Sequence, residues 1–540
     1  MAAPVPCTGA RYSEGDTILQ ELIEEAIIRK AQSVLRNRRI DRAISFKNAD
    51  RYRKRTGLVP GIPSEADPAW WNYHPHFDPA YCIRHARYLS RTIWRKLQDN
   101  LYHPVPAIQF DLPKPDGSHR KIMAFAIPDS ALANLVHRKA TKRNINLFSR
   151  LSYAYRPDQN VFDAILNLSK SLDSPKSYIV QYDFSKYFDT IDHSYIRKVL
   201  FERQLFLLPE AERNAINSFL KHEYAHISTY SHNVFDVRDS GVPQGSSLSL
   251  FLSNAAAHEL DLALEKLNGT FVRFADDVVA VAHSYSDALA ISAAFRDHCN
   301  LAGLKINYDK SPGILLFGGS PEREMRTFTI DTDDGDQLET ISKIDYLGHS
   351  ITACGVNIPS KSIKRIKSKI SSIVHKNLFL HRRNLGDSFN PLRVGPGFTD
   401  WDLTTCINEI RKYIYGGLRE SQIDGFLSDA SKPPYMRGLM GFFPLITDPK
   451  TLIELDGWLL NIIARAQRER RRMLSSNFGV SIPVLTKKEL ISGSWYQYPE
   501  IRNDASLPSF VRAWRAARKY YRRYGLSGIE PPRYYSLNEY

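Results

Sequence analysis

Two short stretches of the chain place aspartates where apolar runs end. Residues 270–282 (TFVRFADDVVAVA) hold Asp276 and Asp277 between two runs rich in β-branched and aromatic residues. This pattern predicts a β-hairpin with carboxylates at its tip, although an acidic pair is also ordinary turn chemistry. A second apolar run, residues 177–183, ends on Asp183, and the residues after it indicate a turn into a helix.

Carboxylates gathered at strand ends repel one another unless a cation lies between them. Hard oxygen ligands of this kind suit Mg²⁺ or Mn²⁺. Two such ions about 3.5–4 Å apart can activate an attacking hydroxyl and stabilise a leaving phosphate oxygen. Phosphoryl transfer is therefore the chemistry that this pattern favours.

Three motifs occur in a fixed order along the chain. Asp183 has Phe188 five residues on, residues 241–249 read GVPQGSSLS, and residues 274–277 read FADD. In this order they resemble the palm of a bacterial reverse transcriptase. The resemblance runs from about Gln109 to Ser350 and continues more weakly to about Leu474.

The chain departs from the family pattern at two motifs, and these departures narrow the group of reverse transcriptases that it resembles. Phe274 stands where the family usually has Tyr, and Ser247 and Leu250 stand where the second motif often has Pro. Such departures are similar to those of the abortive-infection and defence-associated "unknown group" enzymes. They weaken an assignment to the related group II intron or retron reverse transcriptases.

The resemblance implies an α+β right-hand polymerase with fingers, a palm built on an antiparallel sheet and a helical thumb. An N-terminal helical extension and an α-helical C-terminal region flank it. We expect four parts: residues 1–100, a basic helical extension; 101–355, fingers and palm; 356–500, a helical thumb similar to the X region of maturases; and 501–540, a basic tyrosine-rich tail.

The pattern also predicts individual elements. Asp16 and Asp287 are expected N-caps of helices, the second reaching Leu301. Residues 345–348 resemble the primer-grip hairpin of the family. Further on, apolar residues at alternating steps of three and four predict one buried helix face, made of Leu452, Leu455, Leu459, Ile462 and Ala466.

The family's functional positions map onto this chain as expectations. Asp183, Asp276 and Asp277 would be catalytic and hold two Mg²⁺ or Mn²⁺ ions, with deoxynucleoside triphosphates as substrates. Phe188 would exclude a 2′-hydroxyl, unless it is simply a core aromatic. The other expected nucleotide contacts are Lys114 and Arg120 on a hairpin around Pro-Asp-Gly, Gln244 at the templating base pair, and Lys310 near the pyrophosphate.

Basic residues exceed acidic ones by 15 (73 Lys and Arg, 58 Asp and Glu), which favours a polyanionic partner. Residues 36–55 are densely basic and suit RNA contact or a solvated face. A basic flank at residues 465–472, chiefly Arg465, Arg468 and Arg472, is also expected to contact nucleic acid. The resemblance adds Arg156, because residues 152–157 (SYAYRP) are similar to a family motif whose arginine lies near template and nucleotide.

Aromatic residues interleaved with arginines near the C-terminus indicate stacking on bases. The sharper alternative is that one tail tyrosine supplies the hydroxyl that primes synthesis, as in some abortive-infection relatives. The candidates are Tyr520, Tyr521, Tyr524, Tyr534, Tyr535 and Tyr540.

Composition excludes several other classes. Hydrophobic residues make up 43% of the chain, which is typical of a globular protein rather than a disordered one. Five scattered cysteines indicate neither a disulfide framework nor a zinc site. No apolar run approaches 18 residues and the start lacks a signal-peptide pattern, so we expect a cytoplasmic protein that does not contact membranes.

The leading hypothesis is an RNA-directed DNA polymerase that copies a partner noncoding RNA into cDNA in bacterial antiviral defence. One alternative is a polymerase of a mobile element such as a retron or group II intron. The other is a catalytically idle, RNA-binding protein similar to maturases. A homo-oligomeric state is left open.

Overall fold

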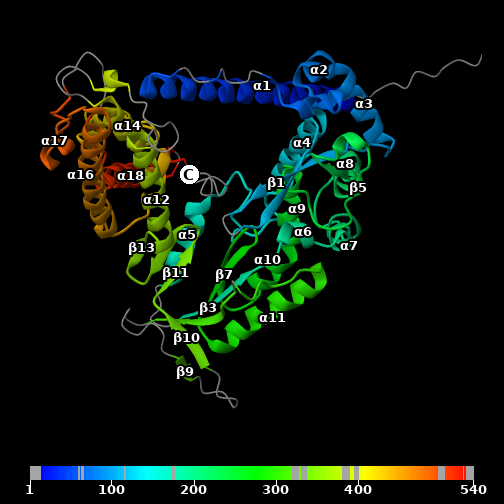
Figure 1. Ribbon diagram of the computed structural model, residues 1–540. Helices are drawn as coiled ribbons and strands as arrows, with labels where there is room; N and C mark the ends of the chain where they lie inside the picture. The colour runs from blue at the N-terminus through cyan, green and yellow to red at the C-terminus, as the bar shows by residue number, and fades with distance from the viewer. Residues whose placement is uncertain are drawn as a thin grey trace, which may run out of the picture. The chain divides into compact units, whose positions relative to one another are not determined.

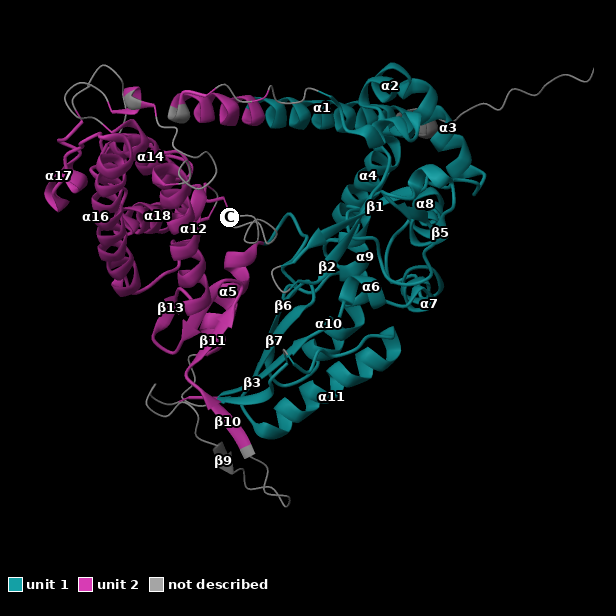
Figure 2. Ribbon diagram, in the orientation of Figure 1, with its two compact units in different colours: residues 1–43, 64–159, 177–316 teal, residues 44–63, 160–176, 317–540 magenta. Residues whose placement is uncertain are grey.

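The computed structural model describes residues 14–58, 61, 66–114, 117–172, 177–309, 311–318, 327–329, 337–379, 390–394, 400–496, 505–526 and 528–530. These residues form two compact units, coloured separately in Figure 2. Unit 1 contains residues 1–43, 64–159 and 177–316, and unit 2 contains residues 44–63, 160–176 and 317–540. The four-part division predicted from the sequence stays a prediction.

Helix α1 (Glu14–Thr56) contributes residues to both units (Figure 2). It begins two residues before the predicted N-cap Asp16. Most of its side chains after Ala31 are partly or fully exposed.

A four-stranded sheet in unit 1 has the strand order β2-β1-β4-β5. Strands β1 and β5 of this sheet are labelled in Figure 1. Strand β1 (Ala107–Pro113) pairs antiparallel with β2 (His119–Ala124), which confirms the predicted hairpin around residue 117. The other two strands are β4 (Glu223–His226) and β5 (Asp236–Val237). Phe77, Ile108 and Tyr230 lie in the apolar core beside this sheet.

The second sheet of unit 1 carries the acidic strand ends. Its strands are β6 (Thr270–Phe274), β7 (Asp277–Ala282), β3 (Ser177–Asp183) and β8 (Gly313–Phe317), in the order β6-β7-β3-β8. Both β6 and β3 pair antiparallel with β7. Residues 278–282 of β7 are completely buried, which explains the unbroken apolar run in the sequence.

Helix α11 (Tyr285–Ala302) packs against β3 and β7. The Tyr182 and Ser292 hydroxyls lie 2.7 Å apart, and the Phe295 ring contacts that of Tyr182. The predicted N-cap Asp287 is wrong, because Ser284 caps this helix by accepting a hydrogen bond from the Asp287 N–H (3.1 Å).

The remaining α-helices described in unit 1 surround the two sheets. They are α2 (Pro79–Arg84), α3 (Ala86–Gln98), α4 (Ile127–Asn144), α6 (Tyr187–Thr190), α7 (His193–Arg197), α8 (Glu210–Leu220), α9 (Leu248–Ala256) and α10 (His258–Glu265). The mixed α+β class is confirmed, and unit 1 has two separate sheets, in the second of which β6, β7 and β3 pair antiparallel as expected.

Unit 2 contains short strands as well as helices. Strands β11 (Lys343–Tyr346), β12 (His349–Thr352) and β13 (Gly355–Asn357) form an antiparallel sheet, and β9 (Thr327–Thr329) pairs with β10 (Gln337–Ile341). Leu347 and Gly348 turn between β11 and β12 with φ of +46° and +76°, so the hairpin predicted at residues 345–348 is present. Helix α5 (Val161–Ser171) packs on β12.

The rest of unit 2 is helical. Its helices are α12 (Ser360–Leu378), α14 (Trp401–Tyr415), α15 (Glu420–Leu427), α16 (Lys450–Phe478), α17 (Lys487–Ser492) and α18 (Phe510–Tyr524). The predicted apolar stripe lies on α16, with Ile463 fully buried where Ile462 was expected. Within the described chain, no helix has both the length and the apolar composition needed to span a lipid bilayer.

Candidate active site

The sheet of unit 1 brings together the three aspartates predicted from the sequence. Asp183 is the last residue of β3 and Asp277 the first of β7, and the two are register partners across the antiparallel pair. Asp276 lies in the two-residue turn between β6 and β7, since Phe274 pairs with Asp277. The chain thus supplies carboxylates from two neighbouring strand ends and the turn beside them.

The electrostatics of these groups favour a bound cation. Burial of the Asp277 carboxyl, together with the negative charges of Asp276 and Asp183, raises its pKa to about 8. A divalent cation would remove this repulsion, and three carboxylates form an oxygen donor set that suits Mg²⁺ or Mn²⁺. Among the residues that the structure describes, no three Asp, Glu, His or Cys side chains are arranged so that they could already hold a metal ion. The expectation that a divalent cation binds here therefore rests on the oxygen donors of the three carboxylates and on the register of the strands that carry them.

Asp183 also forms hydrogen bonds with a later segment of the chain. The only functional residue predicted in that segment from the sequence was Lys310. The Asn307 N–H donates to the Asp183 carbonyl (2.8 Å), and its Nδ2 donates to Oδ2 of the carboxylate (3.3 Å). The Asp183 N–H donates to Ser311 Oγ (2.9 Å). These two polar residues flank Lys310, which lies outside the described residues. Their closeness in sequence to Lys310 was the signal that could have found them.

The loop at residues 241–245 lies against the turn that follows β3. The Val242 N–H donates to the Phe188 carbonyl (2.6 Å), and the Gly241 N–H donates to the Ile191 carbonyl (2.8 Å). Gly241 has a φ of +67°, and a Cβ there would lie 2.5 Å from the Phe188 oxygen. Only glycine fits so close an approach, so this residue fixes the loop beside the partly buried Phe188.

Gln244 joins the same loop to two other elements. Its Nε2 donates to Asp189 Oδ2 (3.2 Å), and its carbonyl accepts from the Met123 N–H of β2 (2.7 Å). Arg238 also reaches Asp189 (3.4 Å). Sequence reasoning missed Asp189, although it directly follows the predicted sugar contact Phe188. The structure therefore places Gln244 on a loop next to α6, the helix that carries Phe188.

The two basic residues predicted on the fingers hairpin lie near its tip. Lys114 is exposed just after β1, and its N–H and carbonyl bond to Ser118 and Gly117 across the turn. Arg120 is partly buried on β2, opposite Leu112. Both belong to unit 1, as the three aspartates do.

Arg156 does not present a free guanidinium. Its side chain is 4% exposed, and it donates to the carbonyls of Phe148 and Ser149 (3.3 and 2.6 Å) and to Asp158 (2.8 Å). Direct contact with a template would require these bonds to break. In the structure its contacts hold the loop that precedes α5.

Three of the arginines predicted to contact nucleic acid lie on the exposed face of α16. Arg465, Arg468 and Arg472 are exposed, and Arg472 pairs with Glu469 (3.1 Å). Arg470 belongs to the same predicted basic flank, but the interpretation of it as a surface residue is wrong. Its side chain is completely buried and pairs with Asp400 and Asp402.

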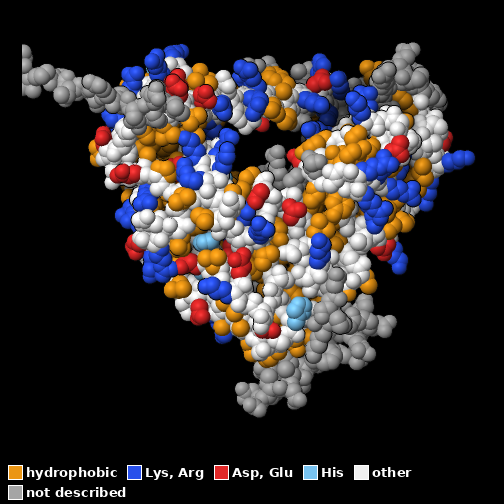
Figure 3. All heavy atoms as spheres, turned by 180° about the vertical axis from the view of Figure 1, so that it is seen from behind, with side chains coloured by type: hydrophobic (Ala, Val, Ile, Leu, Met, Phe, Trp, Pro, Cys, Tyr) orange, Lys and Arg blue, Asp and Glu red, His pale blue; other side chains and the backbone are white. Residues whose placement is uncertain are grey.

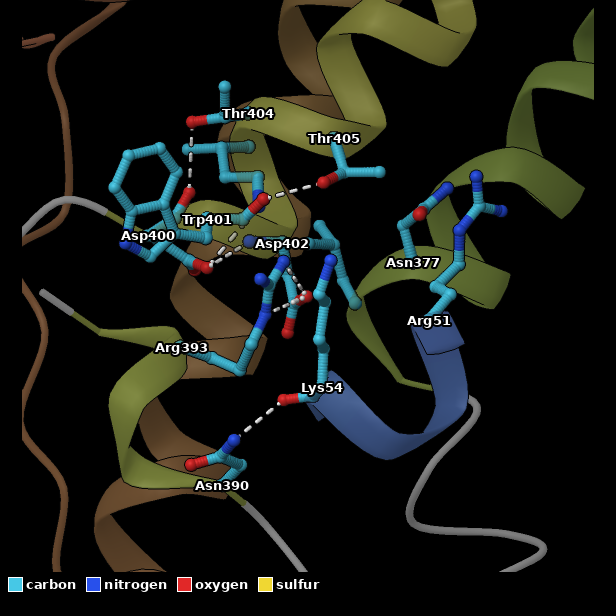
Figure 4. A network of polar contacts seen from close by, with 12 residues as sticks. Arg51, Lys54, Asn377, Asn390, Arg393, Asp400, Trp401, Asp402, Thr404 and Thr405 are labelled. Atoms are coloured by element: carbon cyan, nitrogen blue, oxygen red, sulfur yellow. Dashed lines mark hydrogen bonds and ion pairs between the residues drawn. The ribbon is translucent and has the colours of Figure 1, made fainter. Parts of the chain in front are cut away.

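The acidic partners of Arg470 form a wider polar network in unit 2 (Figure 4). Arg393 donates to Asp402 (2.8 Å), and Asp400 caps α14 by accepting from the N–H groups of Asp402 and Leu403. Nearby, Asn390 donates to the Lys54 carbonyl at the end of α1 (2.8 Å). This network explains why Arg470 lies inside the protein rather than at a nucleic-acid surface.

The basic segment of α1 is partly engaged within the protein. Lys and Arg side chains recur along this helix on the face seen in Figure 3. Arg38 and Arg42 pair with Asp67, and Arg51 pairs with Glu409 (2.6 Å). Others are exposed, namely Arg36, Arg39, Lys47, Arg53 and Lys54. RNA contact by this segment stays a prediction for the exposed subset.

The tyrosines predicted as alternative primers differ in accessibility. Tyr520, Tyr521 and Tyr524 lie on α18, which packs on α15 and α16 rather than forming a tail. Tyr520 is 9% exposed and contacts Phe426, so its hydroxyl is a poor candidate, whereas Tyr524 is 45% exposed. Tyr534, Tyr535 and Tyr540 lie outside the described residues.

Residues 112–351, which include all three aspartates, match the family model described as reverse transcriptase (RNA-dependent DNA polymerase). Protein YkfC of Escherichia coli K12 is 27% identical over 169 residues, which are 31% of this chain and 42% of that protein. The putative COX1/OXI3 intron 2 protein of Saccharomyces cerevisiae is 25% identical over 178 residues, 33% of this chain and 20% of that protein. The chain thus covers less than half the length of either relative.

Solved structures of telomerases are also similar. That of Candida albicans, in complex with a fragment of telomeric RNA, has a TM-score of 0.37 and 14% identity over 71% of this chain and 66% of its own. Apo telomerase of Candida tropicalis has a TM-score of 0.35 and 11% identity over 81% and 67%. Structural similarity at these TM-scores adds nothing to what the strand topology shows about the fold. On the family match and the strand topology, residues 112–351 carry the features of a reverse transcriptase domain.

Proposed function

We propose that this protein is an RNA-directed DNA polymerase, which extends a 3′-hydroxyl with deoxynucleoside triphosphates on an RNA template. The observation that carries the proposal is the register pairing of Asp183 with Asp277 beside Asp276, within the segment that matches the reverse transcriptase family. A scaffold that had lost catalysis would have no need to keep three mutually repelling carboxylates at one sheet edge.

In this proposal, Asp183 and Asp276 hold two Mg²⁺ or Mn²⁺ ions and Asp277 supports them. The ions, when bound, activate the attacking hydroxyl and stabilise the leaving pyrophosphate. Asn307 and Ser311 hold Asp183 in place through its backbone and carboxylate. The raised pKa of Asp277 means that metal binding there also releases a proton near neutral pH.

The incoming nucleotide lies between the fingers hairpin and the palm sheet in this proposal. Lys114 and Arg120 clamp its triphosphate, since a flexible ammonium and a planar guanidinium both bind phosphate oxygens well. Phe188 lies under the sugar, Gln244 faces the templating base pair, and Lys310 contacts the pyrophosphate. The bonds from the loop at residues 241–245 to Phe188 and Met123 support a shared role for these elements.

RNA is the proposed partner and DNA the product. The net charge of +15 and the exposed Arg465, Arg468 and Arg472 on α16 support binding to a phosphate backbone. We propose a dedicated noncoding RNA as template and a cytoplasmic location. The priming hydroxyl comes from RNA, from DNA, or from an accessible tyrosine near the C-terminus. Sequencing the nucleic acid that copurifies with the protein would identify the template.

The biological role that we propose is defence against phage. The support is the sequence pattern, in which Phe274, Ser247 and Leu250 depart from intron and retron enzymes as the defence-associated group does. The test is the plating efficiency of phages on cells with the wild type or with Asp276→Asn. Protection that needs Asp276 supports the role, and equal plating on both strains across a phage panel contradicts it.

A mobile-element polymerase is the second candidate. The identity of 25% to a yeast intron protein favours it. Copurified RNA distinguishes the two: intron RNA would support the mobile element, whereas a single short noncoding RNA would support a defence enzyme.

A further inference from the structure

A completely buried charged side chain near the candidate metal site is that of Arg273, the next-to-last residue of β6. Both Arg273 and its partner Asp261 on α10 are 0% exposed. Two bonds join them, from Nε to Oδ1 (2.7 Å) and from Nη2 to Oδ2 (2.6 Å). Burying an arginine costs a substantial desolvation free energy. Packing alone therefore does not explain why a charged residue lies at this position.

The guanidinium of Arg273 also reaches the turn that carries the aspartates. Its Nη1 donates to the Ala275 carbonyl (3.0 Å) and to Asn254 Oδ1 (3.1 Å), and its Nη2 donates to Ser152 Oγ (2.6 Å). One side chain thus ties the turn to two helices and to the loop at residue 152. The backbone adds to this, because Arg273 exchanges hydrogen bonds with Leu151 and Tyr153 (both 2.9 Å).

The residue held by this bond has an unfavourable backbone conformation. Ala275 has a φ of +62°, in the left-handed region that residues with a Cβ rarely occupy. It directly precedes Asp276, so its conformation sets the direction of the next two carboxylates. An alanine stays in this region only where its surroundings hold it there.

We propose that Arg273, clamped by Asp261, is a positioning residue that holds Ala275 in the left-handed conformation and so orients Asp276 and Asp277 toward metal ions. This inference rests on the proposed function, because it concerns the same carboxylates. It adds a residue that touches neither substrate nor metal. Arg273 acts on the candidate metal site through its hydrogen bond to the Ala275 carbonyl oxygen.

The test uses Arg273→Lys, which keeps a positive charge beside Asp261 but loses the planar fork that reaches Ala275 at the same time. The first readout is Mn²⁺ affinity, measured from the free Mn²⁺ signal in electron paramagnetic resonance. The second is the Mg²⁺ concentration for half-maximal DNA synthesis. We expect weaker Mn²⁺ binding, a higher Mg²⁺ requirement and a rate loss on the order of tenfold to a hundredfold.

The matched rescue is Ala275→Gly, since glycine adopts a φ of +62° at little steric cost. Combined with Arg273→Lys, it should restore part of the lost Mn²⁺ affinity. Wild-type Mn²⁺ affinity in Arg273→Lys, or a loss that glycine does not restore, overturns the inference.

A second variant covers the case in which Arg273→Lys does not fold. Arg273→Met with Asp261→Asn removes both charges together, so no uncompensated charge stays buried. We expect the same shift in Mn²⁺ affinity for the folded protein. If the wild type binds Mn²⁺ yet polymerises nothing, the proposed function fails; if it polymerises and the variants match its affinity, only this inference fails.

Discussion

Arg470 of α16 and Asp402 of α14 form an ion pair (2.9 Å) in which both side chains are completely buried. Asp400 gives Arg470 a second carboxylate (2.6 Å), and the guanidinium also donates to the carbonyl of Leu378 (3.0 Å). A single arginine therefore joins three helical segments of unit 2. Two arginines next to it in sequence, Arg471 and Arg472, are exposed.

Replacing Arg470 with Gln should destabilise the protein strongly, because it leaves the buried Asp400 carboxylate without a positive partner and the buried Asp402 with Arg393 alone. The expected loss is about 3–5 kcal/mol, measured by chemical denaturation followed by circular dichroism. Arg471→Gln is the matched control and should change stability little. Equal stability of the two variants would contradict the assignment of Arg470 to the core.

Truncation of Phe188 to Ala should raise the incorporation of ribonucleotides, because it opens space under the sugar. The measurement is primer extension with each deoxynucleotide replaced by its ribonucleotide. Phe188→Tyr keeps the ring and should stay selective. A wild type that already prefers ribonucleotides would show that the sugar is selected elsewhere or that the enzyme is not a reverse transcriptase.

Neutralising Arg465, Arg468 and Arg472 together should weaken RNA binding and reduce its salt dependence. Each lost phosphate contact should lower the slope of log affinity against log salt by about 0.7–0.9. Arg29→Gln, which removes an exposed arginine paired with Glu25 on α1, is the control. If the triple variant keeps the wild-type slope, these arginines are solvated surface.

Asp129 should make the stability of unit 1 depend on pH. It is buried and accepts hydrogen bonds from the Tyr102 hydroxyl (2.7 Å) and the Val105 N–H (3.0 Å). Its burial raises its pKa to about 7, above the ordinary value near 3.8. The group's contribution to stability is therefore full below about pH 4 and is lost as the pH rises through 7.

Asp129→Asn keeps the side-chain shape and cannot ionise, so the decline in stability between pH 4 and 8 should become shallower than in the wild type. Thermal unfolding across this range gives the comparison. Parallel stability curves for the two proteins would mean that Asp129 does not titrate in the folded state within this window.

The hairpin of β6 and β7, and strand β3 beside it, could be predicted from the sequence because their signals are local. The apolar runs on either side of Asp276 and Asp277 set the hairpin strands, the acidic pair sets the turn, and the run that ends on Asp183 sets β3. The hairpin of β1 and β2 followed from its Pro-Asp-Gly turn in the same way. Such elements depend on residues within a few positions of one another.

The buried arginines could not be predicted in this way. Arg273 depends on Asp261, and Arg470 depends on Asp400, which is 70 residues away in sequence. A charged residue inside a strand or a basic run looks exposed until its partner is known. For Arg470, the helical period offered a signal, since it continues the stripe of Leu459, Ile463, Ala466 and Met473.

The most direct test of the account is primer extension on an RNA of defined sequence, with a DNA primer, Mg²⁺ and the four deoxynucleoside triphosphates. Wild type and Asp276→Asn are compared after both are shown to be folded and to bind the RNA. We expect DNA complementary to the template from the wild type and none from the variant, because the variant lacks a ligand charge at the proposed metal site. Template-copied DNA from Asp276→Asn, or none from the folded and RNA-bound wild type, would contradict it.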